Sequence, residues 1–253
     1  MIIIKNKASI TKMEKAGHHL QEIFDLLEPS IKEGISTLEL DMQIAQLLKE
    51  KKFVSKMLGY RGYAHVSCIS INDEVVHGVP RATTILKDGD LVKVDVCAAL
   101  DGYCADMARA YFIGKPSTVA QQLVEVAQNA LKKGIDQARV GNRLSDISAA
   151  IQQEVEKNGF GVVRDFAGHG IGKQMHEDPE ILNYGKPGKG PLLQVGMAFA
   201  IEPMITQGKY EVYVTKDGWT VKTADKGLAA HVEDTIVITQ TEPKVLTRSN
   251  GKG

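Results

Sequence analysis

The sequence predicts an α+β fold in which two similar halves form one domain. Its 253 residues are 43% hydrophobic and 25% charged, which is the balance of an ordinary globular chain. Similar residues also recur 107 positions apart, as Gly34 and Gly141 do. In each half, amphipathic helices precede segments with strand character. We therefore expect one domain over residues 1–253, with repeated halves at about 10–113 and 117–240.

The repeat is the main support for the two halves, because its matches span helices, turns and strands. Two α+β segments can share some glycines and aliphatic residues by chance, so the acidic pair at the end of the series carries particular weight. The matched pairs are Gly34 with Gly141, Leu40 with Ile147, Ile44 with Ile151, Leu48 with Val155, Phe53 with Phe160, Leu86 with Leu193, Gly89 with Gly196 and Asp95 with Glu202.

Two amphipathic helices are expected at the start of each half. The first ends near Pro29, and Ser36 with Glu39 forms a capping box that opens the second. Residues 117–157 repeat the same helical periodicity. The expected apolar stripes contain Met13, Ala16, Leu20, Ile23, Phe24 and Leu27; Leu40, Ile44, Leu47 and Leu48; Val119, Leu123, Val126, Ala130 and Leu131; and Leu144, Ile147, Ile151 and Val155.

Charge and cysteine content disfavour several classes of protein. The chain has 31 basic and 31 acidic residues, so no net field attracts DNA or an anionic membrane. Cys68, Cys97 and Cys104 contain no Cys-x-x-Cys pair, which argues against a disulfide scaffold and a zinc finger. The first apolar run, Met1–Ile4, is too short for a signal peptide. We expect a cytoplasmic protein that binds neither DNA nor membranes.

Asp95 and Glu202 occupy matching repeat positions at strand-like apolar runs. Asp95 lies within residues 91–96, and Glu202 ends the run 197–202. A buried ionised carboxylate without a partner costs several kcal/mol or becomes protonated. Two such acids at equivalent positions indicate a cation shared between the halves.

An Asp101-Gly102 turn predicts a hairpin that brings a third acid to the same place. A two-residue turn there pairs Cys97 with Asp106. Asp95 and Asp106 then become diagonal neighbours on one face, with backbones roughly 7 Å apart. Like charges at this separation share a proton or bind a metal. The alternative is a solvated hairpin with surface aspartates, which the apolar neighbours of Asp95 disfavour.

Two further residues have the chemistry of metal ligands. His169 lies between Gly168 and Gly170, which permit a close backbone approach or a positive φ. Glu233 precedes the apolar strand at 235–238. The local sequence does not by itself identify either residue as a metal ligand. A histidine in a glycine-rich loop is more often structural, and Glu233 has the least distinctive surroundings of the five candidates.

Together, these candidates comprise four carboxylates and one imidazole, without a cysteine. Such an oxygen-rich set suits Mn, Fe or Co, with Zn also open. Two divalent cations would balance four carboxylates, and bridging carboxylates would hold them about 3.5–4 Å apart. Because this arrangement activates a shared water, the residues indicate metal-assisted hydrolysis.

The order and surroundings of these residues resemble the type I methionine aminopeptidases of the short bacterial form. The resemblance runs from about residue 4 to 247 and implies the α+β pita-bread fold, in which pseudo-two-fold half-domains build a curved antiparallel sheet covered by helices. It implies a metallo-exopeptidase that removes the N-terminal methionine from peptides and nascent proteins with a small second residue. The matching segments are Ser70–Pro80, Leu86–Asp95, Gly168–Gly172, Ile201–Met204 and Lys216–Thr220.

The resemblance also implies two divalent ions per chain, Co, Mn, Fe or Zn. Asp95 would bind one ion with both oxygens, while His169 and Glu202 would bind the other. Asp106 and Glu233 would bridge the two ions. A water activated by both ions would attack the carbonyl of the N-terminal methionine, and Glu202 would also transfer a proton.

The same resemblance assigns the residues that contact the substrate. His176 would stabilise the tetrahedral oxyanion, and His77 would contact the scissile amide nitrogen or the second residue. Read from local context alone, either histidine is an ordinary loop residue. A methionine pocket needs apolar, polarisable walls. The implied walls are Tyr60, Tyr63, Cys68 as a reduced thiol, Met175 and Trp219, with Met57 nearby.

Several positions depart from the family's pattern. Asp234 follows Glu233 where a histidine is common, so it could alter the hydrogen bonds around that glutamate. Met175 replaces a frequent aromatic and would relax side-chain selectivity. His65 and Cys104-Ala105 also stand at unusual places. The remaining histidines, His18, His19 and His231, are interpreted as surface or structural residues.

Two other functions are weighed against this one. An Xaa-Pro aminopeptidase or prolidase carries an added N-terminal domain, for which 253 residues leave no room. A noncatalytic pita-bread binding module would not need to retain five ligand-type residues. We expect a monomer without a ribosome-targeting N-terminal extension. A transient ribosome contact stays open, with Lys49, Lys51, Lys52 and Lys56 as a basic patch whose simpler role is a solvated helix end.

Overall fold

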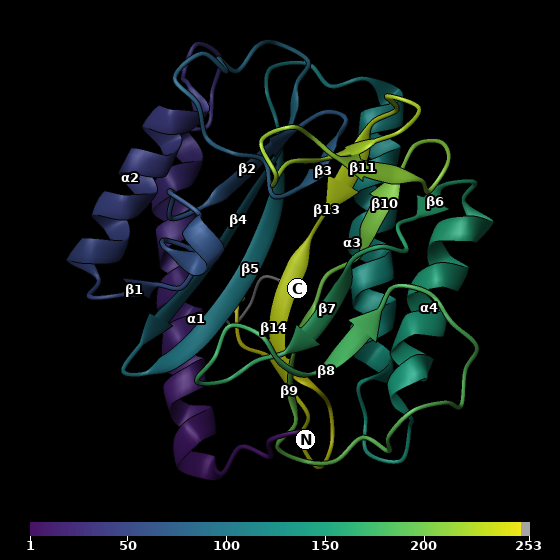
Figure 1. Cartoon of the computed structure of the whole chain (residues 1–253). Helices are drawn as coiled ribbons and strands as arrows, with labels where there is room; N and C mark the ends of the chain where they lie inside the picture. The colour runs from purple at the N-terminus through teal and green to yellow at the C-terminus, as the bar shows by residue number, and fades with distance from the viewer. Residues whose placement is uncertain (249–253) are drawn as a thin grey trace.

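The computed structural model describes residues 1–248 and has an α+β architecture (Figure 1). A central antiparallel sheet of nine strands has helices over one face. Its main path is β1-β4-β5-β14-β9-β7-β8, while β2 also pairs with β4 and β15 with β14. The strands are β1 (Val54–Ser55), β2 (Cys68–Ile71), β4 (Leu91–Leu100), β5 (Tyr103–Phe112), β7 (Ala167–Gly170), β8 (Glu177–Leu182), β9 (Ala198–Ile201), β14 (Glu233–Val237) and β15 (Lys244–Val245).

The predicted helices are present and end where the local sequence dictates. Helix α1 (Lys7–Leu27) is followed by a short 3₁₀ turn, η1 (Glu28–Ser30), that contains Pro29. Helix α2 (Thr37–Glu50) begins with the predicted capping box of Ser36 and Glu39. The second half supplies α3 (Thr118–Gln137) and α4 (Leu144–Lys157). Within residues 1–248, no helix has both the length and the apolar character needed to cross a bilayer.

The repeat seen in the sequence also appears in the backbone. Helices α2 and α4 each have 14 residues. An isolated β-bridge joins Ser36 to Ile85, and another joins Arg143 to Leu192, so both partners are displaced by the offset seen in the sequence. Because equivalent residues make equivalent long-range contacts, the two parts of the chain share a tertiary arrangement as well as a composition.

The centre of the sheet places strands of the two halves side by side. In the order β4-β5-β14-β9, the first two strands come from the N-terminal half and the other two from the C-terminal half. The predicted turn at Asp101-Gly102 joins β4 to β5, and Cys97 pairs with Asp106 as expected. Thr235 Oγ1 accepts the Asp106 N–H at 2.9 Å and donates to its carbonyl at 2.8 Å. These two hydrogen bonds tie the two halves of the chain together beside Asp106.

Each half has its own apolar core between helices and sheet. Phe24 and Val94 are buried in one core, and Leu131 and Phe199 in the other. Apolar burial of this kind contributes about 25 cal/mol per Å² of surface removed from water. A third apolar cluster, which includes Cys104 of β5 and Val237 of β14, spans the seam between the halves beside the polar side chains of these strands.

Two small antiparallel sheets lie at one end of the central sheet, at the top of Figure 1. One has the order β13-β10-β6 and the other β11-β12-β3. They bring the segments before and after several candidate residues together. Their strands are β3 (Glu74–Val76), β6 (Gly161–Val162), β10 (Met204–Thr206), β11 (Val212–Val214), β12 (Val221–Thr223) and β13 (Ala229–His231). A single 3₁₀ turn, η2 (Tyr60–Gly62), precedes β2.

The glycines beside His169 serve a close backbone approach. A Cβ atom at Gly168 would lie 2.5 Å from the Ala200 carbonyl oxygen, and one at Gly170 would lie 2.1 Å from that of Asp178. Neither glycine has a positive φ. The sequence allowed either a positive φ or a close backbone approach at these glycines. The close approach applies, because β7 packs between β8 and β9.

Replacing Gly168 by alanine should destabilise the fold, because backbone on a neighbouring strand cannot give way as a side chain can. We expect Gly168→Ala to lower the free energy of unfolding by about 1–3 kcal/mol, measured by urea denaturation of the metal-free protein. Gly102→Ala is the control. It adds the strain of a positive φ, +81°, but its Cβ would meet open space, so it lacks the clash with a neighbouring strand. An equal or larger cost at Gly102 would contradict this explanation.

Candidate active site

A cavity of about 780 Å³ opens on the face of the sheet opposite α1 and α3. This volume is within the range of small-ligand sites. Every residue that the sequence nominated for the site lines it. These residues are Tyr60, Tyr63, Cys68, His77, Asp95, Asp106, His169, Met175, His176, Glu202, Trp219 and Glu233, with Met57 alongside.

Four neighbouring strands each bring one acid to the floor of this cavity. Asp95 lies on β4, Asp106 on β5 and Glu233 on β14, while Glu202 directly follows β9. His169, on β7, pairs with Ala200 of β9. Because alternate residues of a strand face the same side, the register of these strands directs all five side chains into one space.

Asp106, His169 and Glu233 form the tightest group. Each offers one ligand atom that lies within 4.8 Å of those of the other two. Asp106 Oδ1 and Glu233 Oε1 are buried and lack a hydrogen-bond partner. Such unsatisfied atoms are costly unless an ion or water satisfies them. The group therefore has the vacant acceptors that a cation needs.

The tautomer of His169 points to the same conclusion. Its Nδ1 donates to the Gly170 carbonyl at 3.0 Å, which leaves Nε2 as an acceptor. Nε2 lies 3.5 Å from Glu202 Oε1 and 3.8 Å from Asp106 Oδ2. A lone pair that faces two carboxylates is favourable when a positive ion or a proton lies between them. Burial lowers the pKa of His169 to about 3, so the imidazole is neutral at pH 7, as a metal ligand must be.

The acids have raised pKa values because they are buried together. Burial, reinforced by repulsion from Glu202, raises the pKa of Asp106 to about 8, and burial raises that of Glu202 to about 8. Burial and repulsion among the acids also hold the pKa values of Asp95 and Glu233 well above their usual range. Within residues 1–248, no lysine or arginine forms an ion pair with these four carboxylates. The donor set thus fits oxygen-preferring divalent cations.

His231 is the residue that sequence reasoning missed. It lies on β13 with 2% of its surface exposed, so of the two interpretations, surface or structural, only the second agrees with its burial. Its Nε2 lies 3.5 Å from Glu202 Oε2 and has no hydrogen-bond partner. The signal in the sequence was its place in an apolar run two residues before Glu233, which strand alternation directs to the same side.

Asp234 does not reach the cavity, so it cannot rearrange the hydrogen bonds of Glu233 from that side. Its side chain is fully buried on the opposite face of β14. Oδ1 accepts from Arg109 at 2.7 Å and from Thr247 at 2.8 Å, while Oδ2 accepts from Arg248 Nε at 2.7 Å. The reason is the two-residue period of a strand, which sends neighbouring side chains to opposite faces.

Aromatic and sulfur-containing side chains line one side of the cavity. The rings of Tyr63 and Trp219 meet edge-on at 4.9 Å, and the Tyr63 hydroxyl donates to the Ser67 carbonyl at 2.8 Å. Cys68 lies opposite Asp95 in the β2–β4 pair. Burial and the nearby Asp95 raise the pKa of the Cys68 thiol, which keeps it protonated and unsuited to act as a nucleophile.

Tyr60 and two histidines meet at the mouth of the cavity. The Tyr60 hydroxyl lies 3.2 Å from His176 Nδ1. The His176 ring stands perpendicular to that of His169, with centroids 4.4 Å apart. Burial lowers the pKa of His176, so it is neutral at pH 7. With the hydroxyl as donor, Nδ1 is the acceptor and Nε2 carries the ring proton.

His77 is held in a left-handed backbone conformation with φ +59°. Such a conformation is strained for a residue other than glycine and persists only when its surroundings impose it. The His77 ring packs edge-on against Phe166 at 5.5 Å. Burial, with His231 and His176 nearby, lowers the pKa of His77 to about 4. The neutral ring therefore faces the cavity in one fixed orientation.

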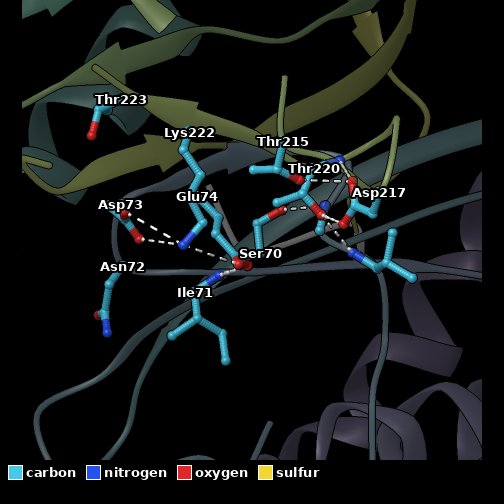
Figure 2. A network of polar contacts seen from close by, with 12 residues as sticks. Ser70, Ile71, Asn72, Asp73, Glu74, Thr215, Asp217, Thr220, Lys222 and Thr223 are labelled. Atoms are coloured by element: carbon cyan, nitrogen blue, oxygen red, sulfur yellow. Dashed lines mark hydrogen bonds and ion pairs between the residues drawn. The ribbon is translucent and has the colours of Figure 1, made fainter. Parts of the chain in front are cut away.

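A polar network holds the segment that carries His77 (Figure 2). The two residues after His77 donate their backbone N–H groups to Ser70 Oγ at 3.0 Å and to Thr220 Oγ1 at 3.3 Å. Thr220 Oγ1 donates in turn to Asp217 at 2.7 Å, and the N–H of Trp219 donates to Asp217 at 2.9 Å. One aspartate thus orders both the His77 segment and the turn that carries Trp219.

The sheet is curved and antiparallel, and it has internal two-fold symmetry. A cluster of carboxylates and an imidazole lies at its centre. These features define a metallohydrolase of the pita-bread fold. The chain belongs to the metallopeptidase family M24, whose model matches residues 11–240. This confirms the fold and family that the sequence motifs predicted.

Relatives and solved structures agree with this family. The methionine aminopeptidase of Clostridium acetobutylicum is 46% identical over 247 residues, which cover 98% of this chain and 99% of that protein. A crystal structure of the methionine aminopeptidase from Rickettsia prowazekii superposes with a TM-score of 0.96 and 39% identity, over 98% of this chain and 100% of the other. A prolidase from Pyrococcus furiosus superposes with a TM-score of 0.77 and 25% identity, and this chain covers 66% of it.

The metal-free protein should become less stable as the pH rises from 6.5 to 8. Asp106 and Glu202 have folded-state pKa values of about 8, above their unfolded values. The folded state therefore binds more protons than the unfolded state, and stability falls until the pH exceeds those values. Burial lowers the pKa of Lys93 to about 7, so this residue opposes the fall in stability. Its contribution is at most one proton, whereas the acids contribute up to four. Urea midpoints at the two pH values measure the effect.

The four histidines with lowered pKa values oppose the fall in the lower part of this interval, because each is neutral when folded and about half protonated at pH 6.5 when unfolded; the effect fades by about pH 7.5, and the four acids outweigh it. Asp106→Asn removes one of the titrating acids and should show a smaller fall. A midpoint that rises over this interval in the metal-free protein would show that the acids are not protonated when folded.

Proposed function

We propose that this chain is a metal-dependent methionine aminopeptidase. The observation that carries the proposal is the convergence of two buried acids, two half-buried acids and a neutral histidine on one cavity floor, beside a wall of aromatic and sulfur-containing residues. Support also comes from the near-complete coverage of methionine aminopeptidases, compared with the partial coverage of a prolidase. The proposed substrates are peptides and nascent proteins with an N-terminal methionine and a small second residue.

The proposal includes two divalent ions. Asp95 would hold one ion with both oxygens, His169 and Glu202 would hold the other, and Asp106 with Glu233 would contact both. Divalent ions supply Lewis acidity and lower the pKa of a bound water toward neutrality. The support is electrostatic, because four buried carboxylates can ionise together only when comparable positive charge lies among them. The oxygen-rich donor set leaves Co, Mn, Fe and Zn open as the ions.

Three residues would act on the substrate itself. Glu202, ionised when positive charge lies among the acids, would accept a proton from the attacking water and pass it to the leaving amine. His176 would donate from Nε2 to the oxygen of the scissile carbonyl, because a bond from the Tyr60 hydroxyl to Nδ1 would leave the ring proton on Nε2. His77 would contact the amide nitrogen or the second residue of the substrate.

The methionine side chain would lie against the aromatic and sulfur wall. A thioether makes favourable contacts with aromatic rings and with other polarisable groups. The pair of Tyr63 and Trp219 offers such a surface, and Cys68 and Met175 add sulfur beside it. Phe166, whose ring packs against that of His77, would narrow the side of the cavity opposite this wall. A narrow space there would favour substrates with a small second residue.

We propose that the whole chain works as one catalytic domain. Asp95 and Asp106 come from the N-terminal half, while His169, Glu202 and Glu233 come from the C-terminal half. Neither half contains a complete set of ligands. A monomer therefore suffices for the chemistry, in a cytoplasmic setting where newly made chains are available.

Chelation should abolish release of methionine from a Met-Gly peptide. We expect a loss of at least about 100-fold, because a Lewis-acidic ion supplies several kcal/mol of transition-state stabilisation. Adding Mn or Co should restore the rate, measured as free methionine. Asp95→Asn should need far more metal for the same recovery, whereas Asp136→Asn, on α3 and outside the cavity, should behave as wild type.

Two outcomes would count against the proposal. A rate unaffected by exhaustive chelation would exclude the metal mechanism. Faster hydrolysis of Xaa-Pro peptides than of Met-Gly peptides would favour a prolidase-like enzyme, and a metal-loaded protein inert on the whole panel would favour a binding module.

Tyr60→Phe should lower kcat while leaving KM for a Met-Gly peptide nearly unchanged. The variant keeps the aromatic wall but removes the hydroxyl that bonds to His176 Nδ1. Loss of such an orienting partner costs about 10–100-fold in activity. The control is Tyr103→Phe, whose hydroxyl bonds to Ser9 outside the cavity. A rise in KM with an unchanged kcat would assign Tyr60 to the methionine pocket alone.

A further inference from the structure

The loop between β7 and β8, residues 171–176, is tied to the N-terminal segment of the chain by a buried ion pair. Lys5 Nζ lies 2.7 Å from Glu177 Oε2, and only 3% of the lysine side chain and 5% of the glutamate side chain are exposed. Burying two charges is costly unless their geometry is close and further hydrogen bonds satisfy both groups. The fold must therefore hold both partners in place.

The carboxylate of Glu177 folds back into the β7–β8 loop and closes it. Its Oε1 accepts the backbone N–H groups of Lys173 at 2.9 Å and of Gln174 at 3.3 Å. Gly172 leaves room for this carboxylate, because a Cβ atom there would lie 2.5 Å from Oε1. The loop thus forms around a negative charge, and His176 is the residue directly before the one that supplies it.

The segment that supplies Lys5 is fixed against the sheet. Residues 1–6 run past the start of β9 before α1 begins (Figure 1). Lys5 donates its backbone N–H to the Gly196 carbonyl at 2.8 Å, and its Nζ donates to the Ile3 carbonyl at 2.9 Å. A Cβ atom at Gly196 would lie 2.6 Å from the Lys5 carbonyl oxygen, so the two backbones are in close contact. The ammonium group is therefore presented to the loop from a fixed position.

The contacts of His176 make its place in the cavity sensitive to this loop. The Tyr60 hydroxyl lies 3.2 Å from His176 Nδ1, and the His169 ring stands perpendicular to the His176 ring with centroids 4.4 Å apart. Both partners come from outside the loop, on η2 and β7. A displacement of the loop by about 1 Å would disturb both contacts, and misplacements of that size can cost about 100-fold in rate.

We propose that Lys5 is a positioning residue for the peptidase reaction, which holds the loop that presents His176 to the scissile carbonyl by neutralising Glu177. This inference rests on the proposed function, because it assigns Lys5 a part in that same reaction. Lys5 does not line the cavity and acts through Glu177. Without the ammonium group, the buried carboxylate would take up a proton or turn toward water. Either change weakens its bonds to the loop.

Lys5→Met tests the proposal, because it keeps an apolar stem of similar length and removes the charge. We expect kcat for a Met-Gly peptide to fall about 10–100-fold with KM nearly unchanged, measured on the metal-loaded protein. Lys7→Met is the matched control, since Lys7 is exposed at the start of α1, and it should behave as wild type. In a His176→Ala background the same Lys5 substitution should change kcat less than about twofold, because two residues that act through one contact are not additive.

Hydrogen exchange separates this proposal from the proposed function. In zinc-loaded Lys5→Met, the amide hydrogens of Lys173 and Gln174 should exchange at least about tenfold faster than in the wild type, measured by NMR. The ring-nitrogen signals of His176 should shift in the same spectra. If the wild-type protein hydrolyses no peptide, the peptidase function fails, whereas these two changes still support the positioning of His176 by Lys5.

Three outcomes would overturn the proposal. One is an unchanged kcat in Lys5→Met when the wild type is active, and another is an equally large loss of kcat in the His176→Ala background. The third is unchanged amide exchange and unchanged His176 signals. Urea unfolding shows whether Lys5→Met folds. If it does not, Glu177→Gln replaces it with the same expected results, because it keeps an oxygen for the loop amides and removes the charge that Lys5 neutralises.

Discussion

Four carboxylates that face one another, two of them buried and two half-buried, are the constraint on which the rest of this structure depends. They come from four neighbouring strands, one from each, and lie symmetrically about the seam between the halves. Without cations their mutual repulsion and burial keep protons on them. The neutral tautomer of His169, the unsatisfied oxygens of Asp106 and Glu233 and the glycines that admit β7 beside β9 all serve this one arrangement.

Strand alternation lets the same two central strands carry opposite charges on opposite faces. On one face, β5 and β14 present Asp106 and Glu233 to the cavity. On the other, Arg109 and Asp234 form a buried pair that Arg248 completes. A chain with a net charge of zero therefore contains an acidic centre on one face of the sheet and an arginine–aspartate network on the other.

The groups around the metal-type cluster are rigid because their partners are backbone atoms or buried acids. His77 keeps a left-handed conformation since the residues after it are bonded to Ser70 and Thr220. Trp219 is ordered by the same Asp217 that orders Thr220. Such fixed surroundings reduce the reorganisation that a reaction requires, which is the general advantage of a preorganised polar site.

The sequence by itself determined the elements and their local contacts. The capping box of α2, the turn at Asp101-Gly102 and the register of Asp106 all depend on interactions within short stretches of chain. Tertiary structure decided the burial of His231, the pairing of Asp234 with Arg109 and Arg248 and the contact between Tyr60 and His176. These depend on which distant strands become neighbours, and in a single sequence without such neighbours a histidine or an aspartate looks the same whether it is buried beside an acid or exposed to water.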